Sequence, residues 1–308
     1  MTTRRTFLRG GVAVAATSAA TLGGLAACGG SLLGAASSGR DVGVPDAARI
    51  NAGAGALRQS VCRWCYRDIP LPELARAAKG MGLQSVELLE PEEFAVVAAE
   101  GLGCAMANAP GEARLRITRG FNRVEQHALL IPQYVRHIEL AARAGVPNLI
   151  CFSGTRAGMS NEEGLAACAT GLRALTPIAE RAGVTLCMEL LNSKVDHRDY
   201  QCDHTAWGAE LVTRVASPRF RLLYDIYHMQ IMEGDVIRTI RQYHDVIVHY
   251  HTGGVPGRHE IDDGQELFYP AIMRAIRDTG FTGYVAQEFI PVRAPLESLA
   301  DAVRRCTI

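Results

Sequence analysis

The sequence predicts an α/β protein built as a single (β/α)8 barrel, the TIM-barrel architecture, preceded by a signal peptide and a flexible tether. Two observations support this prediction. After an N-terminal stretch without hydrophobic periodicity, about 250 of the 308 residues remain, and this is the usual size of such a barrel. Over those residues, short apolar runs alternate with stretches of helical apolar spacing, which is typical of strands that alternate with helices.

Eight apolar runs are the candidate strands, and seven helical stretches lie between them. The strands are expected at residues 60–66, 85–89, 104–108, 148–153, 185–190, 221–226, 246–251 and 284–289. The helices are expected at residues 71–79, 91–100, 122–144, 162–182, 206–215, 236–242 and 270–278. Several helices stop at a glycine, such as Gly145 and Gly183, which suits a helix C-terminus. A doubly wound open sheet is the alternative, but no GxGxxG follows the first strand.

The chain begins with the pattern of an export signal. Arg4 and Arg5 precede a weakly apolar, uncharged segment rich in Ala, Gly and Thr, which ends in the sequence LAAC at Cys28. The arginine pair resembles the Tat signal, and LAAC resembles a lipobox, whose cysteine is lipidated. We therefore expect a signal peptide at residues 1–28, export by Tat to the periplasm or cell envelope, and a lipid anchor at Cys28. A plain membrane span is the alternative, which the short and rather polar segment disfavours.

Composition separates a tether from the folded domain and excludes one class of partner. Residues 29–56 are rich in Gly, Ala and Ser without a hydrophobic period, which indicates a flexible linker. The barrel is therefore expected at residues 57–308. The chain carries 32 Lys and Arg against 32 Asp and Glu and no run of like charges, so nothing favours a nucleic-acid partner. This composition is typical of an enzyme or binding protein for small molecules, and whether the protein is a homo-oligomer stays open.

Acidic and imidazole side chains occur at the ends of the last four candidate strands. They are Glu189, Asp225, His251 and Glu288. In a barrel these strand ends form the active-site face. Buried together without a metal, three carboxylates would repel one another, although any one of them alone is more simply explained as a helix cap or an arginine partner. Three carboxylates and one imidazole suit Mg²⁺ or Mn²⁺ better than zinc, so we expect a divalent-metal site.

Several longer stretches resemble one known family. They are SVCRWCY, ELLNSKVDH, YDIYHMQIMEGD, HYHTGGVPGRHEIDDGQELFY and GYVAQEF. Residues 58–291 resemble the hydroxypyruvate isomerase branch of the xylose isomerase-like TIM barrels, which also contain ketose 3-epimerases. The resemblance implies that Glu189, Asp225, His251 and Glu288 bind the metal. It also implies that Glu189 and Glu288 are the acid and base, and that His228 and Arg258 hold the substrate.

The same resemblance implies a reaction. A metal-dependent aldose–ketose type isomerase would convert a small hydroxy-keto acid, as in hydroxypyruvate to tartronate semialdehyde, through an enediolate with two glutamates as acid and base. One departure leaves the substrate open, because the isomerases often have Gln where His251 stands and the epimerases tend to have His. The alternatives are a ketose 3-epimerase acting on a free sugar and a non-catalytic sugar-binding barrel of the cell envelope. A metal-dependent hydrolase of the endonuclease type is disfavoured by the zero net charge.

Three further features lie near the expected site. His249 should share the inward strand face with His251, so it is expected to contact the substrate or to support the residues that do, with a structural histidine as the alternative. Trp64 is expected at the wall of the substrate pocket, and core packing is the alternative. Cys62 and Cys65 have the spacing of a redox or zinc motif, but no second pair follows, which favours packing.

Overall fold

The computed structural model describes residues 56–308. The predicted signal peptide at residues 1–28, its lipidation site Cys28 and all but the last residue of the predicted linker at 29–56 lie outside the described residues. Within the described part, no helix combines the length and the apolar character that crossing a membrane requires.

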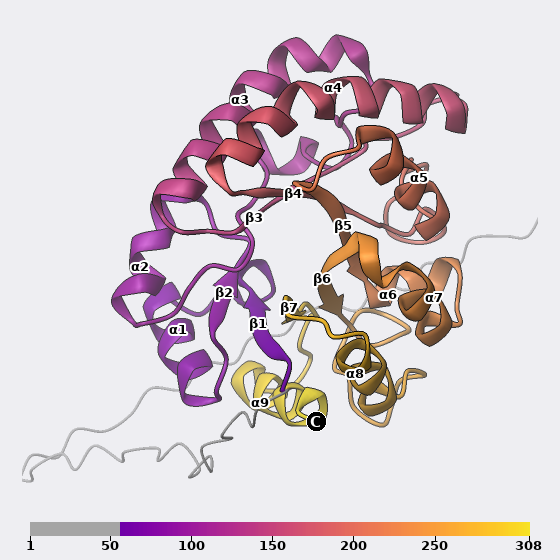
Figure 1. Ribbon diagram of the computed structural model, residues 1–308. Coiled ribbons are helices and arrows are strands. Elements are labelled where there is room, and N and C mark those ends of the chain that lie inside the picture. Colours follow the sequence, from indigo (N-terminus) through magenta and orange to yellow (C-terminus); the bar gives the residue numbers. More distant parts are fainter. Residues whose placement is uncertain (1–55) are drawn as a thin grey trace, which may run out of the picture. The chain divides into compact units, whose positions relative to one another are not determined.

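The core of the fold is a parallel sheet whose strands run in the order β2-β1-β7-β6-β5-β4-β3. The strands are β1 (Arg58–Cys62), β2 (Ser85–Glu87), β3 (Asn148–Cys151), β4 (Thr185–Glu189), β5 (Phe220–Asp225), β6 (Ile247–Thr252) and β7 (Tyr284–Gln287). Parallel neighbours require crossover connections, and helices supply most of them on the outside of the ring of strands (Figure 1). This is the predicted (β/α)8 architecture.

The segment at residues 104–108 joins the two edges of the sheet. Ala107 makes single parallel bridges to Leu89 and to Leu149, and its backbone N–H donates to the carbonyl of Asn148 at 2.8 Å. The prediction of a continuous strand here was wrong, although the segment lies where the third strand of a barrel belongs. Its alanines have low strand propensity, and isolated bridges are enough to close the ring.

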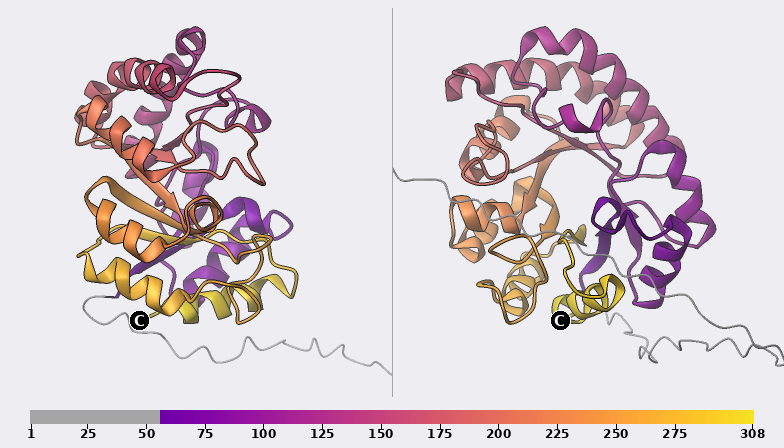
Figure 2. Two further views of the ribbon diagram at one scale, coloured as in Figure 1. Left: turned by 90° about the vertical axis from the view of Figure 1, so that its right-hand side faces the viewer. Right: turned by 180° about the vertical axis from the view of Figure 1, so that it is seen from behind.

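Helices surround the strands in all three views (Figures 1 and 2). They are α1 (Leu71–Gly80), α2 (Phe94–Ala99), α3 (Val124–Arg143), α4 (Asn161–Ala182), α5 (Thr205–Val215), α6 (Ile226–Met232), α7 (Val236–Tyr243), α8 (Tyr269–Asp278) and α9 (Pro295–Cys306). Short 3-10 helices lie at Arg63–Tyr66, Pro91–Glu93, Ala113–Leu115 and His244–Val246. Helices α6 and α9 were not predicted. Helix α6 starts directly after Asp225, the last residue of β5, so no turn or loop separates it from the strand.

Local signals explain the long helix α4. The hydroxyl of Ser160 accepts from the backbone N–H of Glu163 at 3.2 Å, and the Glu163 carboxylate accepts from the backbone N–H of Ser160 at 2.8 Å. This capping box satisfies donors that the first turn leaves free. The helix ends at Gly183, whose φ of 72° is the left-handed conformation common after a helix. Between these ends, the buried residues of α4 pack against β4 and against the neighbouring helices α3 and α5.

The first strand is shorter than predicted. It ends at Cys62, and residues Arg63–Tyr66 form a 3-10 helix in place of the last four residues of the expected strand at 60–66. The early end of the strand turns the chain over the C-terminal end of the barrel. As a result Trp64 approaches the residues at the ends of the other strands.

Candidate active site

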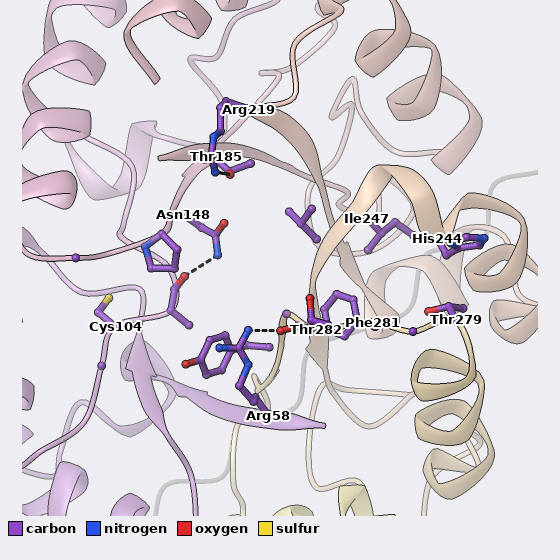
Figure 3. A pocket seen from close by; sticks show the side chains of 18 of the residues that line it. Arg58, Cys104, Asn148, Thr185, Arg219, His244, Ile247, Thr279, Phe281 and Thr282 are labelled. Carbon is purple, nitrogen blue, oxygen red and sulfur yellow. Dashed lines mark hydrogen bonds between the residues drawn. The ribbon is translucent and has the colours of Figure 1, made fainter. Parts of the chain in front are cut away.

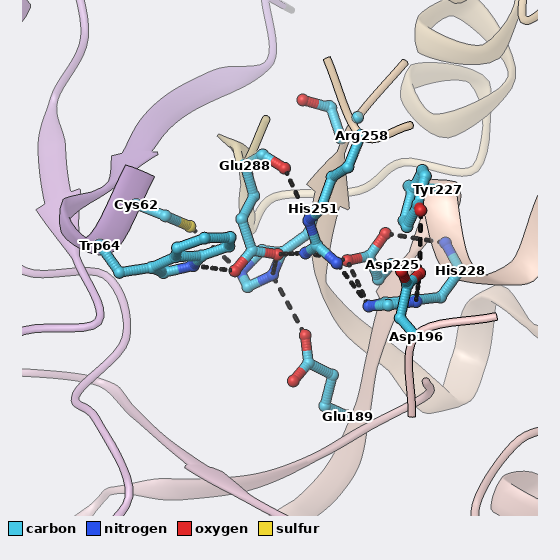
Figure 4. Close-up of polar contacts among 12 residues, drawn as sticks. Cys62, Trp64, Glu189, Asp196, Asp225, Tyr227, His228, His251, Arg258 and Glu288 are labelled. Carbon is cyan, nitrogen blue, oxygen red and sulfur yellow. Dashed lines mark hydrogen bonds and ion pairs between the residues drawn. The ribbon is translucent and has the colours of Figure 1, made fainter. Parts of the chain in front are cut away.

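The structure brings together the acidic and imidazole side chains at the C-terminal ends of four neighbouring strands (Figure 4). They are Glu189 of β4, Asp225 of β5, His251 of β6 and Glu288 directly after β7. Each offers one ligand atom, and these atoms all lie within 4.8 Å of one another. All of these side chains are buried. Strands that are neighbours in the sheet therefore place four distant parts of the sequence around one point.

Asp225 makes two kinds of contact because strand β5 runs directly into helix α6. One of its oxygens caps the helix, and the other faces the acidic cluster. Its Oδ1 accepts a hydrogen bond from the backbone N–H of His228 at 3.1 Å and caps the helix. Its Oδ2 faces the cluster and lies 2.8 Å from Nη2 of Arg258. The cap fixes the carboxylate plane, so the second oxygen is held toward the other acidic groups.

His251 faces three carboxylates, two through Nδ1 and one through Nε2. Its Nδ1 lies 2.7 Å from Oε2 of Glu288 and 3.5 Å from Oε1 of Glu189. Its Nε2 lies on the opposite side of the ring, 3.0 Å from Oε1 of Glu87. Glu87 ends strand β2, is fully buried and was not among the predicted site residues. The signal that identified Glu189, a carboxylate within an apolar run, is also present in the sequence SVELL around Glu87.

His249 lies behind His251. Its Nε2 is 2.8 Å from Oε1 of Glu87, and its ring packs edge-on against the His251 ring with 5.2 Å between ring centres. The side chain is fully buried. The structure therefore places His249 beside Glu87. It does not place His249 beside His228 and Arg258, where a residue that contacts the substrate directly is expected.

Arg258, which the resemblance implies holds the substrate, lies among the acidic side chains. Its Nη2 contacts Oδ2 of Asp225 and Oε2 of Glu288, and its Nε donates to the backbone carbonyl of Glu288 at 3.2 Å. Its Nη1 lies 2.6 Å from Nε2 of His228. A substrate can reach both arms of this fork only if the guanidinium gives up some of these contacts.

Two aromatic rings flank the Arg258 guanidinium. Its central carbon lies 5.5 Å from the ring centre of Trp64 and 5.0 Å from that of Tyr227, distances at which a cation is attracted to the ring face. Trp64 also donates from Nε1 to Oε1 of Glu288 at 2.5 Å, and the Tyr227 hydroxyl donates to Oδ2 of Asp196 at 2.8 Å. Trp64 is thus in direct contact with the acidic cluster. Tyr227 and Asp196 are site neighbours that were not predicted.

His228 faces two N–H donors. Its Nδ1 lies 2.7 Å from Nδ2 of Asn192, and its Nε2 lies 2.6 Å from Nη1 of Arg258. Burial, with the nearby Arg258 charge, holds the pKa of His228 well below its usual range, and a neutral imidazole accepts at only one nitrogen. The Asn192 amide is fixed because its Oδ1 accepts from the backbone N–H groups of Val195 and Asp196. The contact between Nη1 of Arg258 and Nε2 of His228 is therefore the one that can break.

Burial and neighbouring charges shift the pKa values of the three carboxyl groups of the cluster in different directions. Burial, reinforced by Glu288, raises the pKa of Asp225 to about 8 against the opposing effect of Arg258. Burial also raises the pKa of Glu189. Burial would raise the pKa of Glu288 as well, but Arg258 and His251 outweigh it and lower that pKa well below its usual range. The cluster therefore contains one carboxyl group held ionised and two held toward the protonated form.

The donor set fits a divalent cation. When ionised, the three carboxylates exceed the single guanidinium by two negative charges, and the ligand atoms all lie within 4.8 Å of one another. Carboxylate oxygens with one imidazole nitrogen suit Mg²⁺ or Mn²⁺. The residues that would hold the ion are Glu189, Asp225, His251 through Nδ1, and Glu288.

A separate cavity of about 620 Å³ opens at the other end of the barrel (Figure 3). Its lining includes the first residues of several strands, among them Asn148, Thr185 and Tyr284, together with Arg58 and Arg219. In Figure 3 these two arginines lie on opposite sides of the opening and do not converge. The acidic cluster lies at the C-terminal strand ends instead, where barrels of this kind carry their chemistry.

Known proteins of similar sequence include two isomerases. The 2-oxo-tetronate isomerase of Cupriavidus necator is 30% identical over 242 residues, which are 73% of this chain and 89% of that protein. The hydroxypyruvate isomerase of Escherichia coli K12 is 30% identical over 155 residues, which are 50% of this chain and 59% of that protein.

Solved structures of similar fold include an AP endonuclease, family 2, from Brucella melitensis, with a TM-score of 0.70, 23% identity, and coverage of 79% of this chain and 97% of that chain. Another is the 3-keto-D-glucoside 4-epimerase of E. coli, with a TM-score of 0.67, 21% identity, and coverage of 81% and 100%. At these identities the likeness concerns the fold alone. The family model described as Xylose isomerase-like TIM barrel matches residues 75–306, from within α1 to the end of α9. The chain therefore belongs to the xylose isomerase-like TIM barrel family.

Proposed function

We propose that this protein is a metal-dependent isomerase of a small hydroxy-keto acid of the hydroxypyruvate type. One observation supports the proposal above all others, namely the convergence of two glutamates, Glu189 and Glu288, on a buried point that Asp225 and His251 also face. The two isomerases of similar sequence, named for hydroxypyruvate and 2-oxo-tetronate, support the substrate class. A barrel that only bound sugars would have no need of two buried glutamates facing each other.

The ion would be Mg²⁺ or Mn²⁺, held by Glu189, Asp225, His251 and Glu288. When bound, it would supply a Lewis acid for the substrate carbonyl and an adjacent oxygen. The remaining chemistry is proton transfer by the protein's own carboxyl groups.

The two glutamates are suited to opposite proton-transfer roles. The low pKa of Glu288, set by Arg258 and His251 against burial, favours the ionised form that accepts a proton from the carbon beside the carbonyl. The raised pKa of Glu189, caused by burial, favours the protonated form that returns a proton to the adjacent carbon. In the metal-free protein, this difference between the two carboxyl groups supports Glu288 as the base and Glu189 as the acid. The enediolate between these steps would form in the space the two carboxyl groups share.

Arg258 and His228 are proposed to bind the substrate. Arg258 shares oxygens of Asp225 and Glu288 that would also hold the ion, so its guanidinium would be free to pair with a substrate carboxylate when those oxygens bind metal. That pairing would also relieve the excess of donors around His228. Trp64 would remain beside the guanidinium and form part of the pocket wall.

A ketose 3-epimerase acting on a free sugar is the second candidate function. It is favoured by His251, which stands where the epimerases tend to have histidine. The two reactions need the same residues, because returning the proton to the opposite face of one carbon epimerises it and returning it to the neighbouring carbon isomerises the substrate.

A substrate panel tests the proposal. The Mn²⁺-loaded protein would be incubated with hydroxypyruvate, a 2-oxo-tetronate and free ketoses, and the products identified by NMR. We expect conversion of an oxo acid that stops when the metal is chelated. Epimerised ketose without oxo-acid conversion would favour the second candidate, and no conversion of any member would contradict both.

We further propose export by Tat and a lipid anchor at Cys28, supported by the arginine pair and the LAAC sequence. Changing Arg4 and Arg5 to lysine should retain the protein in the cytoplasm, because the Tat pathway reads the arginines themselves. Changing Cys28 to serine should release it from the membrane fraction. Fractionation with immunoblotting measures both, and unchanged export or unchanged membrane attachment would contradict the corresponding proposal.

A further inference from the structure

Glu87 is a fully buried carboxylate to which the reaction described above gives no role. It lies at the end of β2, opposite Cys62 of β1 in the strand pairing. Its Oε1 lies 2.8 Å from Nε2 of His249 and 3.0 Å from Nε2 of His251. Strands β1 and β7 separate β2 from β6 in the sheet, so these contacts cross the interior of the barrel.

We propose that Glu87 is a positioning residue for His251. By accepting a hydrogen bond from Nε2–H, its carboxylate keeps the proton on that nitrogen and fixes the ring so that Nδ1 faces Glu189 and Glu288. This inference rests on the proposed function, because the lone pair on Nδ1 is the one that a metal ion in the cluster would use. A carboxylate on the outer nitrogen of a metal-binding histidine orients the ring and makes it a stronger ligand.

The surroundings of Glu87 fit an acceptor of two hydrogen bonds. A buried ionised carboxylate is costly unless donors satisfy it, and two Nε2–H groups from one strand face meet its Oε1. His249 therefore contacts the same carboxylate oxygen as His251 and supplies the second hydrogen-bond donor to it.

A competing assignment would make Glu87 a metal ligand itself. Cys62, Glu87 and His251 form a second group with metal-ligand atoms close together, and Sγ of Cys62 lies 4.0 Å from Oε1 of Glu87 and 3.8 Å from Nε2 of His251. Figure 4 shows Cys62 and His251 side by side. Burial raises the pKa of the Cys62 thiol well above its usual range, which disfavours the thiolate that binds metals. The two assignments predict different metal stoichiometries, one ion per chain if Glu87 only positions His251 and two if it is a ligand.

The test is the change Glu87→Gln in the full chain. Glutamine has nearly the same shape and keeps one carbonyl oxygen, but it has no negative charge, so its hydrogen bonds to the two imidazoles are weaker and it orients the His251 ring less firmly. We expect Mn²⁺ to bind about 10- to 100-fold more weakly than in the wild type, measured by calorimetry, with one ion per chain in both proteins. Wild-type affinity in a folded Gln variant, or two ions falling to one, would overturn the proposal.

Matched variants separate positioning from a general loss of stability. Glu92→Gln removes an exposed carboxylate five positions further along the chain and should leave Mn²⁺ affinity unchanged. Glu87→Asp keeps the charge but withdraws the carboxylate, and it should bind Mn²⁺ more weakly than the wild type and more tightly than Glu87→Gln. If the Gln variant does not fold, the Asp variant decides, and wild-type affinity there would contradict the role of Glu87.

A metal-free measurement distinguishes failure of this inference from failure of the proposed function. In ¹⁵N-labelled protein with a chelator, the Nε2–H of His251 should give a downfield proton resonance typical of a bond to a carboxylate, and this resonance should move in Glu87→Gln. A resonance that does not respond overturns the inference even if the enzyme is active. If the resonance responds and the wild type binds no Mn²⁺, Glu87 orients His251 but the metal site of the proposed function is wrong.

Discussion

Changing either Glu189 or Glu288 to glutamine is expected to lower turnover at least about 100-fold, the usual scale for loss of a general acid or base. Glutamine keeps the size of the side chain and one oxygen donor but cannot take up a proton near neutral pH. Steady-state kinetics on the substrate identified by the panel measures the effect. Metal affinity should fall less in these variants than on removal of the Asp225 carboxylate.

The two glutamine variants should also differ from each other. If Glu288 is the base, the Glu189→Gln protein still removes the substrate proton and exchanges it with solvent, whereas the Glu288→Gln protein does neither. Glu210→Gln, a change of an exposed carboxylate on α5, is the matched control and should retain full turnover. Near wild-type turnover in both Glu189→Gln and Glu288→Gln would mean that the glutamates are only ligands, which contradicts the proposed mechanism.

Removal of the Asp225 carboxylate is expected to abolish the stabilisation of the fold by metal. A ligand that binds only the folded state stabilises it by mass action, by about 2.7 kcal/mol when its concentration is 100 times Kd. Wild-type protein should therefore melt at a higher temperature with Mn²⁺ than with a chelator, and Asp225→Ala should show no such difference. Calorimetry or differential scanning fluorimetry measures the shift.

Asp225 also caps α6, so the test needs a second variant that keeps the cap but removes the charge. Alanine removes the cap as well as the ligand, and a lost cap costs about 1 kcal/mol whether or not metal is present. Asp225→Asn keeps an oxygen that can accept from the His228 N–H and removes the charge. We expect the Asn variant to be more stable than the Ala variant in chelator yet to respond to Mn²⁺ far less than the wild type. A full Mn²⁺ response in both variants would exclude Asp225 as a ligand.

The sequence was informative where a polar residue interrupts an apolar run. Glu189, Asp225 and His251 each stand at the end of such a run, and the barrel rule places strand ends on one face. Glu87 carries the same signal on β2, but a carboxylate near the start of a barrel cannot be tied to a histidine on β6 until the ring of strands is closed. That contact depends on tertiary structure alone.

Other features of the site were beyond the sequence for similar reasons. The sequence shows that residue 258 carries a guanidinium but not where this group points. Its direction depends on how the loop that contains Arg258 packs against β5 and the end of β7, and in the structure it points toward the carboxylates. The end of β1 at Cys62 was missed because Arg63–Tyr66 contains aromatic residues that also suit a strand. Helix α6 was missed because it follows β5 directly after Asp225, with no turn or loop residues between the two elements.

The most direct test of the central claim is proton exchange in D₂O. The claim is that buried carboxylates, with a divalent metal, move a proton at the carbon beside a carbonyl. Mn²⁺-loaded protein incubated with hydroxypyruvate in D₂O should incorporate deuterium at the carbon that bears the hydroxyl group, faster than buffer with Mn²⁺ alone, and the incorporation should stop with a chelator and in Glu288→Gln. Incorporation at the buffer rate with hydroxypyruvate, with a 2-oxo-tetronate and with every ketose of the panel would contradict the claim.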